Sequence, residues 1–237
     1  DAVLEIEGLT LKTPDGARVL CTDLSIRIRK AQHVLIVGES GAGKSSLLRA
    51  IAGLWTTGAG HIKRPSPSET FFLPQRPYCT LGTLREQLLY PIRPDDSSRP
   101  QPSDRELLDL LDQVKLPDLA SRLKEADGGN GLESVRDWSA MLSLGEQQRL
   151  GFARLLLNNP TLAILDEASS ALDLVSEKAM YELLEQRTSL TYISVGHRPS
   201  LVDYHDSKLR LKLQGFQLEP ISKDSQSAPL AQSQTLL

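Results

Sequence analysis

The feature that most constrains the fold is the segment HVLIVGESGAGKSS, residues 33–46. Its first five residues form a continuous apolar run, as expected of a strand buried on both faces of a sheet. The glycine-rich stretch that follows matches the pattern G-x-x-x-x-G-K-[ST] and leads into a helix predicted over about 44–53. A strand, a glycine-rich loop and a helix in direct succession predict a phosphate site at the end of a parallel strand.

We expect the whole loop to surround the phosphate. Glycines let backbone N–H groups curl around an anion, and the helix N-terminus adds its dipole. Lys44 supplies positive charge and Ser45 offers a hydroxyl to Mg²⁺. The alternative, a glycine-rich turn with a solvated lysine, is disfavoured by the strand, loop and helix context. The predicted binding residues are Gly38, Glu39, Ser40, Gly41, Ala42, Gly43, Lys44, Ser45 and Ser46.

The rest of the chain predicts an α/β fold. Two more apolar runs, LAIL at 162–165 and TYISV at 191–195, indicate buried strands. They alternate with helical patterns, which implies a mostly parallel sheet flanked by helices. The N-terminal segments VLEIEGLTLKT and LCTDLSIRIRK alternate apolar and polar residues around PDG, which predicts an antiparallel β subdomain. The helical patterns fall at about 104–116, 145–157 and 175–187.

The middle and the end of the chain depart from this alternation. Residues 76–158 contain helical segments and polar loops without a convincing strand, so we predict a helical subdomain inserted into the α/β core. Residues 219–237 are rich in Ser and Gln and are predicted to form a flexible tail after a domain of residues 1–218.

Asp166 and Glu167 end the strand 162–165, which we expect to lie beside the strand that carries the glycine-rich loop. Asp166 could hold Mg²⁺ through water, and Glu167 could polarise the water that attacks a γ-phosphate. Taken alone, two carboxylates after a strand are more often ordinary polar residues. Together with the loop from Gly38 to Ser45 they favour catalysis.

Two further polar residues follow apolar runs toward the same sheet edge. His197 follows TYISVG and is expected opposite the γ-phosphate, where it could hold Glu167 and the nucleotide in register. Gln75 follows FFLP, and its side-chain carbonyl could reach the metal or the attacking water. A lone histidine or glutamine is usually only a partly buried polar residue, and Gln75 is the weaker signal.

Ser143 and Glu146 precede a strong helical pattern and match the capping box, in which both side chains satisfy backbone N–H groups. A helix N-terminus with Ser143 and the small Gly145 is also suited to an anion. Since the chain already has one phosphate loop, a second anion site predicts a second nucleotide.

Composition excludes several other classes of protein. A net charge of −3 argues against a nucleic-acid partner, and two cysteines without CxxC spacing suggest neither a disulfide framework nor a zinc site. No apolar run approaches the length of about 18 residues that a membrane span needs. The start, DAVLEIEGLT, has neither an initiator Met nor a signal-peptide pattern, so we expect a domain of a longer protein.

These motifs, in this order, resemble the ATP-binding cassette (ABC) ATPases over about residues 3–215. GESGAGKSS resembles the Walker A loop, LSLGEQQ the signature, LAILDE the Walker B motif and SALD (170–173) the D-loop. Gln75 resembles the Q-loop glutamine and His197 the switch histidine. The resemblance implies a P-loop NTPase that binds ATP and Mg²⁺ and dimerises head to tail, so that Ser143, Gly145 and Glu146 face the partner's ATP.

The flanks FFLPQRPYCTLGTLREQLLYP and SVGHRPSL resemble the D subfamily of ABC transporters and its bacterial relatives. This likeness implies a cassette at the cytosolic face of a membrane, joined to an N-terminal transmembrane domain that lies near Arg76–Leu88. Two departures from the family are Leu144 with Glu146 in the signature, and Thr13 where an aromatic residue usually stacks on adenine.

The sequence therefore favours an ATPase that powers a membrane transporter. The alternative is a binding module that dimerises with ATP as a regulatory switch and hydrolyses little. A soluble ABC ATPase acting on DNA or ribosomes is disfavoured by the acidic composition.

Overall fold

The structure is a computed structural model that describes residues 1–92, 100–127, 129–212 and 215–221. Its centre is a six-stranded sheet with the order β5-β6-β7-β3-β8-β9. All neighbouring strands are parallel except β8 and β9, which confirms the predicted mostly parallel sheet. The strands are β3 (His33–Gly38), β5 (Thr70–Leu73), β6 (Leu162–Asp166), β7 (Thr191–Val195), β8 (Ser207–Lys212) and β9 (Gly215–Pro220).

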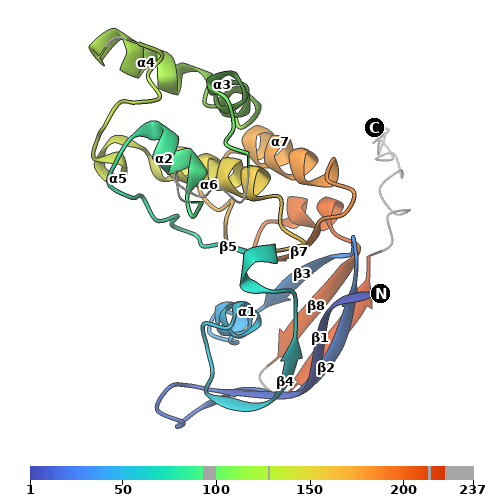
Figure 1. Cartoon of the computed structure of the whole chain (residues 1–237). Coiled ribbons are helices and arrows are strands. Elements are labelled where there is room, and N and C mark those ends of the chain that lie inside the picture. The colour runs from blue at the N-terminus through green and yellow to red at the C-terminus, as the bar shows by residue number, and fades with distance from the viewer. Residues whose placement is uncertain (93–99, 128, 213–214, 222–237) are drawn as a thin grey trace, which may run out of the picture.

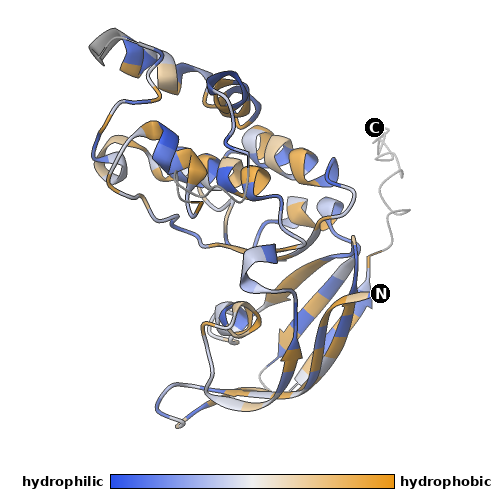
Figure 2. Ribbon diagram, in the orientation of Figure 1, coloured by the Kyte–Doolittle hydropathy of each residue, from blue (hydrophilic) through white to orange (hydrophobic). Residues whose placement is uncertain are grey.

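A separate three-stranded antiparallel sheet lies at the N-terminal end of the molecule, as predicted. Strands β1 (Ala2–Lys12) and β2 (Val19–Arg29) pair across the PDG turn. Strand β4 (Gly58–Lys63), which the sequence did not reveal, pairs with the other side of β1. Figure 2 shows alternating hydrophilic and hydrophobic bands along these strands, because one face packs on the core and the other faces solvent.

The prediction that β6 lies directly beside β3 is wrong. Strand β7 lies between them and pairs with both. The chain passes from β6 through α7 (Leu174–Glu185) back to the parallel strand β7, and such a crossover places consecutive strands side by side. The carboxyl ends of β3, β7 and β6 therefore meet at one edge in that order.

Two apolar clusters cover the two faces of the central sheet. Residues that alternate along a strand point to opposite faces, so Ile36 and Ile164 join one cluster and Leu35 and Leu165 the other. The first cluster contains helix α1 (Lys44–Ala52) and the antiparallel sheet. The second contains α7 and the helical region. This packing holds the edge that carries the polar residues between two rigid layers.

The described part of residues 76–158 forms helices and contains no strand, only an isolated bridge between Thr83 and Val135. Figure 1 shows these helices gathered at the end of the molecule opposite β1, β2 and β4. They are α2 (Leu84–Leu89), α3 (Asp104–Gln113), α4 (Pro117–Asp127), α5 (Trp138–Met141) and α6 (Leu144–Asn158). Two short 3-10 helices, Pro67–Glu69 and Pro199–Tyr204, lie outside this region.

Strand β9 runs to Pro220, so the central sheet continues two residues past the predicted domain boundary at residue 218. The predicted flexible tail otherwise falls on residues 222–237, which lie outside the described part of the chain. Among the described residues, the helices fall short of the length and hydrophobicity needed to span a bilayer.

Candidate functional site

The glycine-rich loop connects β3 to α1 and is shaped by its glycines. Gly38 has φ +154°, and a β-carbon there would lie 2.5 Å from the Leu211 carbonyl oxygen. Gly43 has φ +89°, and a β-carbon there would lie 3.1 Å from Cβ of Leu20. Since L-residues avoid both the conformation and the contact, the loop can close around an anion only with glycine at these positions.

Lys44 and Ser45 begin helix α1 at the mouth of the loop. The ammonium of Lys44 is buried and donates to the carbonyl oxygens of Gly38 and Glu39, each at 2.9 Å. The hydroxyl of Ser45 donates to Oδ1 of Asp166 at 2.8 Å. Although β7 lies between β3 and β6, this hydrogen bond joins the start of α1 to the end of β6.

Asp166 is a buried carboxyl at this junction. Burial raises its pKa above the ordinary value, although the Ser45 hydroxyl and the positive charges of Arg49 and Lys44 act in the opposite direction. A buried carboxylate oxygen beside a hydroxyl oxygen is a donor pair suited to a hard cation such as Mg²⁺.

Glu167 lies between Gln75 and His197. Nε2 of Gln75 donates to Oε2 of Glu167 at 3.1 Å, and Nε2 of His197 lies 3.3 Å from Oε1. Glu167 has φ +52°, a left-handed conformation that a residue with a long side chain seldom adopts. Its backbone N–H donates to the carbonyl of Val195 at 3.0 Å, which ties the strained residue to β7. The structure thus brings together the four residues that we predicted at this edge.

Gln148 connects this group to helix α6, and sequence analysis missed it. Its side chain is fully buried and donates to the carbonyl of Gln75 at 2.8 Å and to the hydroxyl of Ser170 at 3.1 Å. Its own carbonyl accepts from the N–H of Ala171 at 2.9 Å. Gln148 follows the predicted capping box, so only its position two residues after Glu146 hinted at a role.

Ser143 and Glu146 form the predicted capping box at the start of α6. The Ser143 oxygen accepts from the Glu146 N–H at 3.3 Å, and the Glu146 carboxylate accepts from the Ser143 N–H at 2.9 Å. Burial opposes ionisation of Glu146, but hydrogen bonds from Ser143 and from Arg122 outweigh it and lower its pKa. A β-carbon on Gly145 would lie 3.1 Å from the carbonyl oxygen of Ala171. The start of α6 therefore lies against the loop that follows Glu167.

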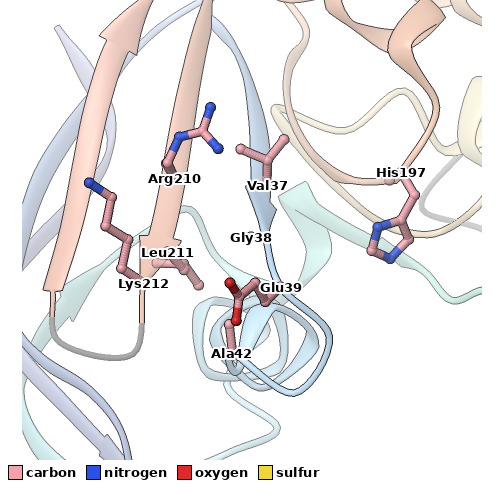
Figure 3. Close-up of a pocket in the computed structure, with 9 residues that line it drawn as sticks. Val37, Gly38, Glu39, Ala42, His197, Arg210, Leu211 and Lys212 are labelled. Atoms are coloured by element: carbon pink, nitrogen blue, oxygen red, sulfur yellow. The ribbon is translucent and has the colours of Figure 1, made fainter.

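A hollow of about 650 Å³ opens beside the glycine-rich loop, between Glu39 and His197. Figure 3 shows Arg210 and Lys212, both on β8, on the side of Gly38 opposite His197. The sequence did not point to these two cations, because β8 was not predicted as a strand. They add positive charge on the flank of the loop.

Comparison with known proteins identifies the chain. A family model described as "ABC transporter" matches residues 21–170. The chain belongs to the ABC transporter family. The matched residues include the glycine-rich loop and Asp166 with Glu167, and ABC transporter ATP-binding domains are ATPases.

Two relatives in the ABC transporter family support the predicted subfamily. An uncharacterized ABC transporter ATP-binding protein of Synechocystis is 49% identical over 93% of this chain and 32% of its own length. ABC transporter D family member 2 of Arabidopsis thaliana, a chloroplastic protein, is 41% identical over 88% of this chain and 34% of its own length. The chain thus spans about a third of the curated relatives that it matches.

A solved structure of a bacterial Atm1-family ABC exporter with ATP bound has a TM-score of 0.77 over 92% of this chain and 38% of that chain. The two sequences are 24% identical, so this likeness concerns the fold. It confirms the predicted P-loop NTPase fold with its antiparallel N-terminal sheet.

The structure accommodates both departures from the usual ABC sequence. Leu144 is the first residue of α6 and has helical backbone geometry, so it needs no glycine. Thr13 lies in the turn after β1, where its hydroxyl donates to Asp15. Arg18 completes the same turn and donates from Nη2 to the Gly41 carbonyl at 3.1 Å, so a guanidinium borders the loop on the side of the antiparallel sheet.

Proposed function

We propose that this domain hydrolyses ATP to drive transport by a longer membrane protein, acting as a head-to-tail pair of copies. The observation that carries the proposal is the position of Glu167, held between Gln75 and His197 next to the pair formed by Asp166 and Ser45. A carboxylate fixed beside a phosphate loop is suited to polarise a water molecule for attack on a γ-phosphate.

Each residue of one copy has a distinct task. Backbone N–H groups of Gly38–Ser46 and the dipole of α1 bind the phosphates, and the Lys44 ammonium turns from the loop carbonyls toward them. Glu167 accepts the hydrogen bond of the attacking water. His197 holds Glu167 from the other side and lies beside the phosphate loop. Once ATP is bound, these charges favour the transition state because they need no further rearrangement during the reaction.

The residues present fit a magnesium ion. Ser45 and Asp166 offer adjacent oxygens, and Gln75 can offer its carbonyl oxygen because its Nε2 already donates to Glu167. Within the described residues, the structure has no cluster of three or more His, Cys, Asp or Glu that would form a complete protein cage. Mg²⁺ commonly uses one or two carboxylates together with phosphates and water. When bound, the ion neutralises charge on the phosphate oxygens.

Ser143, Gly145 and Glu146 would serve the ATP of a second copy. Ser143 brings a hydroxyl to the N-terminus of α6, and Gly145 adds no side chain to it. Within its own chain, Ser143 caps α6, and the capping hydrogen bonds hold the N-terminus of this helix in place. An identical chain is the simplest partner, since it supplies the same phosphate loop.

The transmembrane domain of the longer protein would dock on the helical region at the cytosolic face of the membrane. Tyr78 and Leu81 lie in the segment Arg76–Leu88 and are largely exposed. Exposed apolar residues of this kind are typical of an interaction surface. The net charge of −3 gives no support to a nucleic-acid partner.

The test is Mg²⁺-dependent ATP hydrolysis by this chain over a wide range of protein concentration. Since a complete site needs two chains, the rate per chain should rise with concentration, and Glu167→Gln should lower kcat by at least about a hundredfold. Tight ATP binding without turnover in the wild type would instead support the regulatory switch. A rate independent of concentration would contradict the shared site.

A further inference from the structure

A buried carboxylate lies close to the group formed by Gln75, Glu167 and His197 without belonging to it. Glu177, on α7, is 1% exposed. It accepts from the hydroxyls of Ser169 at 2.8 Å and Ser200 at 2.6 Å, and from Nη1 of Arg198 at 3.3 Å. Ser169 lies in the loop after β6. Arg198 ends the loop after β7, and Ser200 lies in the 3-10 helix Pro199–Tyr204 that follows it, so Glu177 joins segments that are distant in the sequence.

Arg198 adds a second connection between the same loops. Its Nη2 donates to the carbonyl oxygen of Ser170 at 3.0 Å while Nη1 reaches Glu177. The planar guanidinium can hold two acceptors at once in a fixed geometry, which the single ammonium of a lysine does less well. Glu177 and Arg198 together form a clamp across the two loops.

The two loops in the clamp carry the reacting groups. Ser169 and Ser170 follow Glu167 by two and three residues, and Arg198 directly follows His197. The clamp therefore sets the separation of the chain segments on which the 3.3 Å contact between Glu167 and His197 depends.

Stability alone does not explain this arrangement. A buried carboxylate loses its hydration, and an apolar side chain of similar size in place of a buried ion pair is often neutral or stabilising. The bonds of Glu177 and Arg198 instead fix the relative positions of two loops that would otherwise be joined mainly through the strands preceding them.

We propose that Glu177 and Arg198 are positioning residues that hold the loops of Glu167 and His197 in the geometry required for ATP hydrolysis. This role rests on the proposed function, because it acts through those two residues. Neither Glu177 nor Arg198 lines the hollow beside the glycine-rich loop, so they should act on turnover and leave binding of ATP unchanged.

The first test compares Glu177→Gln with Glu182→Gln. Glu182 lies on the same helix and makes an exposed pair with Lys178 at 3.7 Å, so it is a matched control. We expect Glu177→Gln to lower kcat about ten- to a hundredfold, since a small displacement of a reacting group has effects of this size. KM should stay within about threefold of wild type, and Glu182→Gln should leave both constants within about twofold.

The second test separates positioning from folding. Arg198→Gln leaves the buried Glu177 without its cation and should lower the melting temperature by about 5 to 10 °C. The double variant Glu177→Gln/Arg198→Gln removes that unpaired charge and should recover most of the loss. Its kcat should nevertheless stay low, because the clamp is absent from all three variants.

Three results would overturn the role. One is an unchanged kcat in Glu177→Gln, and another is a kcat that recovers together with the melting temperature in the double variant. The third is a wild-type chain without ATP hydrolysis, which would refute the proposed function first. Only the first two results contradict the positioning role of Glu177 and Arg198 while leaving the proposed ATPase function intact.

Discussion

At the scale of single residues, Ser143 has two roles, one in capping α6 and one in the proposed contact with the partner's ATP. Its oxygen accepts from the Glu146 N–H and its hydroxyl donates to the Glu146 carboxylate at 2.9 Å, so it caps α6. In the proposed dimer the same residue meets a phosphate of the partner's ATP. A single substitution to alanine would therefore confuse the two effects.

Substitution of Ser143 by asparagine and by alanine should separate capping from ligand binding. Asparagine is as good an N-cap as serine, so Ser143→Asn should stay within about 0.5 kcal/mol of the wild-type free energy of unfolding, whereas Ser143→Ala should lose about 1 kcal/mol. Both variants should lose at least about tenfold in kcat, because neither presents a small hydroxyl to the phosphate. Urea unfolding and ATP hydrolysis measure the two quantities.

An asparagine variant with full activity would contradict this prediction. In that case the capping bond alone would account for Ser143, and the partner's phosphate would have to be bound elsewhere.

At the scale of elements, α6 connects the predicted capping box to the loops of Gln75 and Ala171, which lie far from it in the sequence. Its first residues carry the capping box, and one turn later Gln148 holds the backbones of Gln75 and Ala171. A rigid helix between these points means that movement at its start is transmitted to the loop that follows Glu167.

Replacement of Gln148 by leucine should show this connection. The variant leaves buried backbone groups without partners, so it should lose about 2 kcal/mol of stability and at least about tenfold in kcat. Gln87→Leu is the matched control, since Gln87 is equally buried but bonds to Thr80 and Arg154 within the helical region. It should lose similar stability with kcat within about threefold.

Equal losses of kcat in both glutamine variants would argue against transmission through α6 and for a general effect of destabilisation. The fraction of folded protein in each assay, measured by circular dichroism, corrects the rates before they are compared.

Much of this architecture could be predicted from local sequence, and the failures have physical reasons. The apolar run HVLIV predicted β3, because a strand buried on both faces is apolar throughout. In β8, SKLRLK, apolar residues alternate with charged ones, and this strand was not predicted. Strand order depends on pairing between distant segments, so the place of β7 beside β3 was missed. Buried polar residues such as Gln148 and Glu177 look in the sequence like a solvated helix face, and only their tertiary contacts distinguish them.

At the scale of the whole molecule, the helical region and the antiparallel sheet lie at opposite ends, with β5 and β7 of the central sheet between them (Figure 1). Exposed apolar residues occur at both ends. Leu81 is 92% exposed in the helical region, and Leu54 is 67% exposed after α1. Under the proposed function only the first surface meets a membrane domain.

Substitution of each leucine by serine should distinguish the two surfaces. In the chain alone, Leu81→Ser and Leu54→Ser should both stay within about 0.5 kcal/mol of wild-type stability and within about twofold of its ATPase rate. In the longer membrane protein, Leu81→Ser should reduce transport per ATP hydrolysed by at least about threefold, since it removes an apolar contact that the proposed docking buries against the membrane domain. Leu54→Ser should not.

Equal effects of the two substitutions on transport in vesicles would contradict docking through the helical region. A loss confined to Leu54→Ser would place the membrane domain on the opposite end of the molecule.

The left-handed backbone of Glu167 has a consequence for attempts to improve this protein. A long side chain in that conformation costs about 1 kcal/mol, which glycine or asparagine would largely avoid. Directed evolution that rewards heat resistance alone would therefore tend to replace the residue on which hydrolysis is proposed to depend. Libraries built on this domain need a simultaneous screen for turnover, because a substitution of Glu167 that stabilises the protein would also remove the side chain proposed to support hydrolysis.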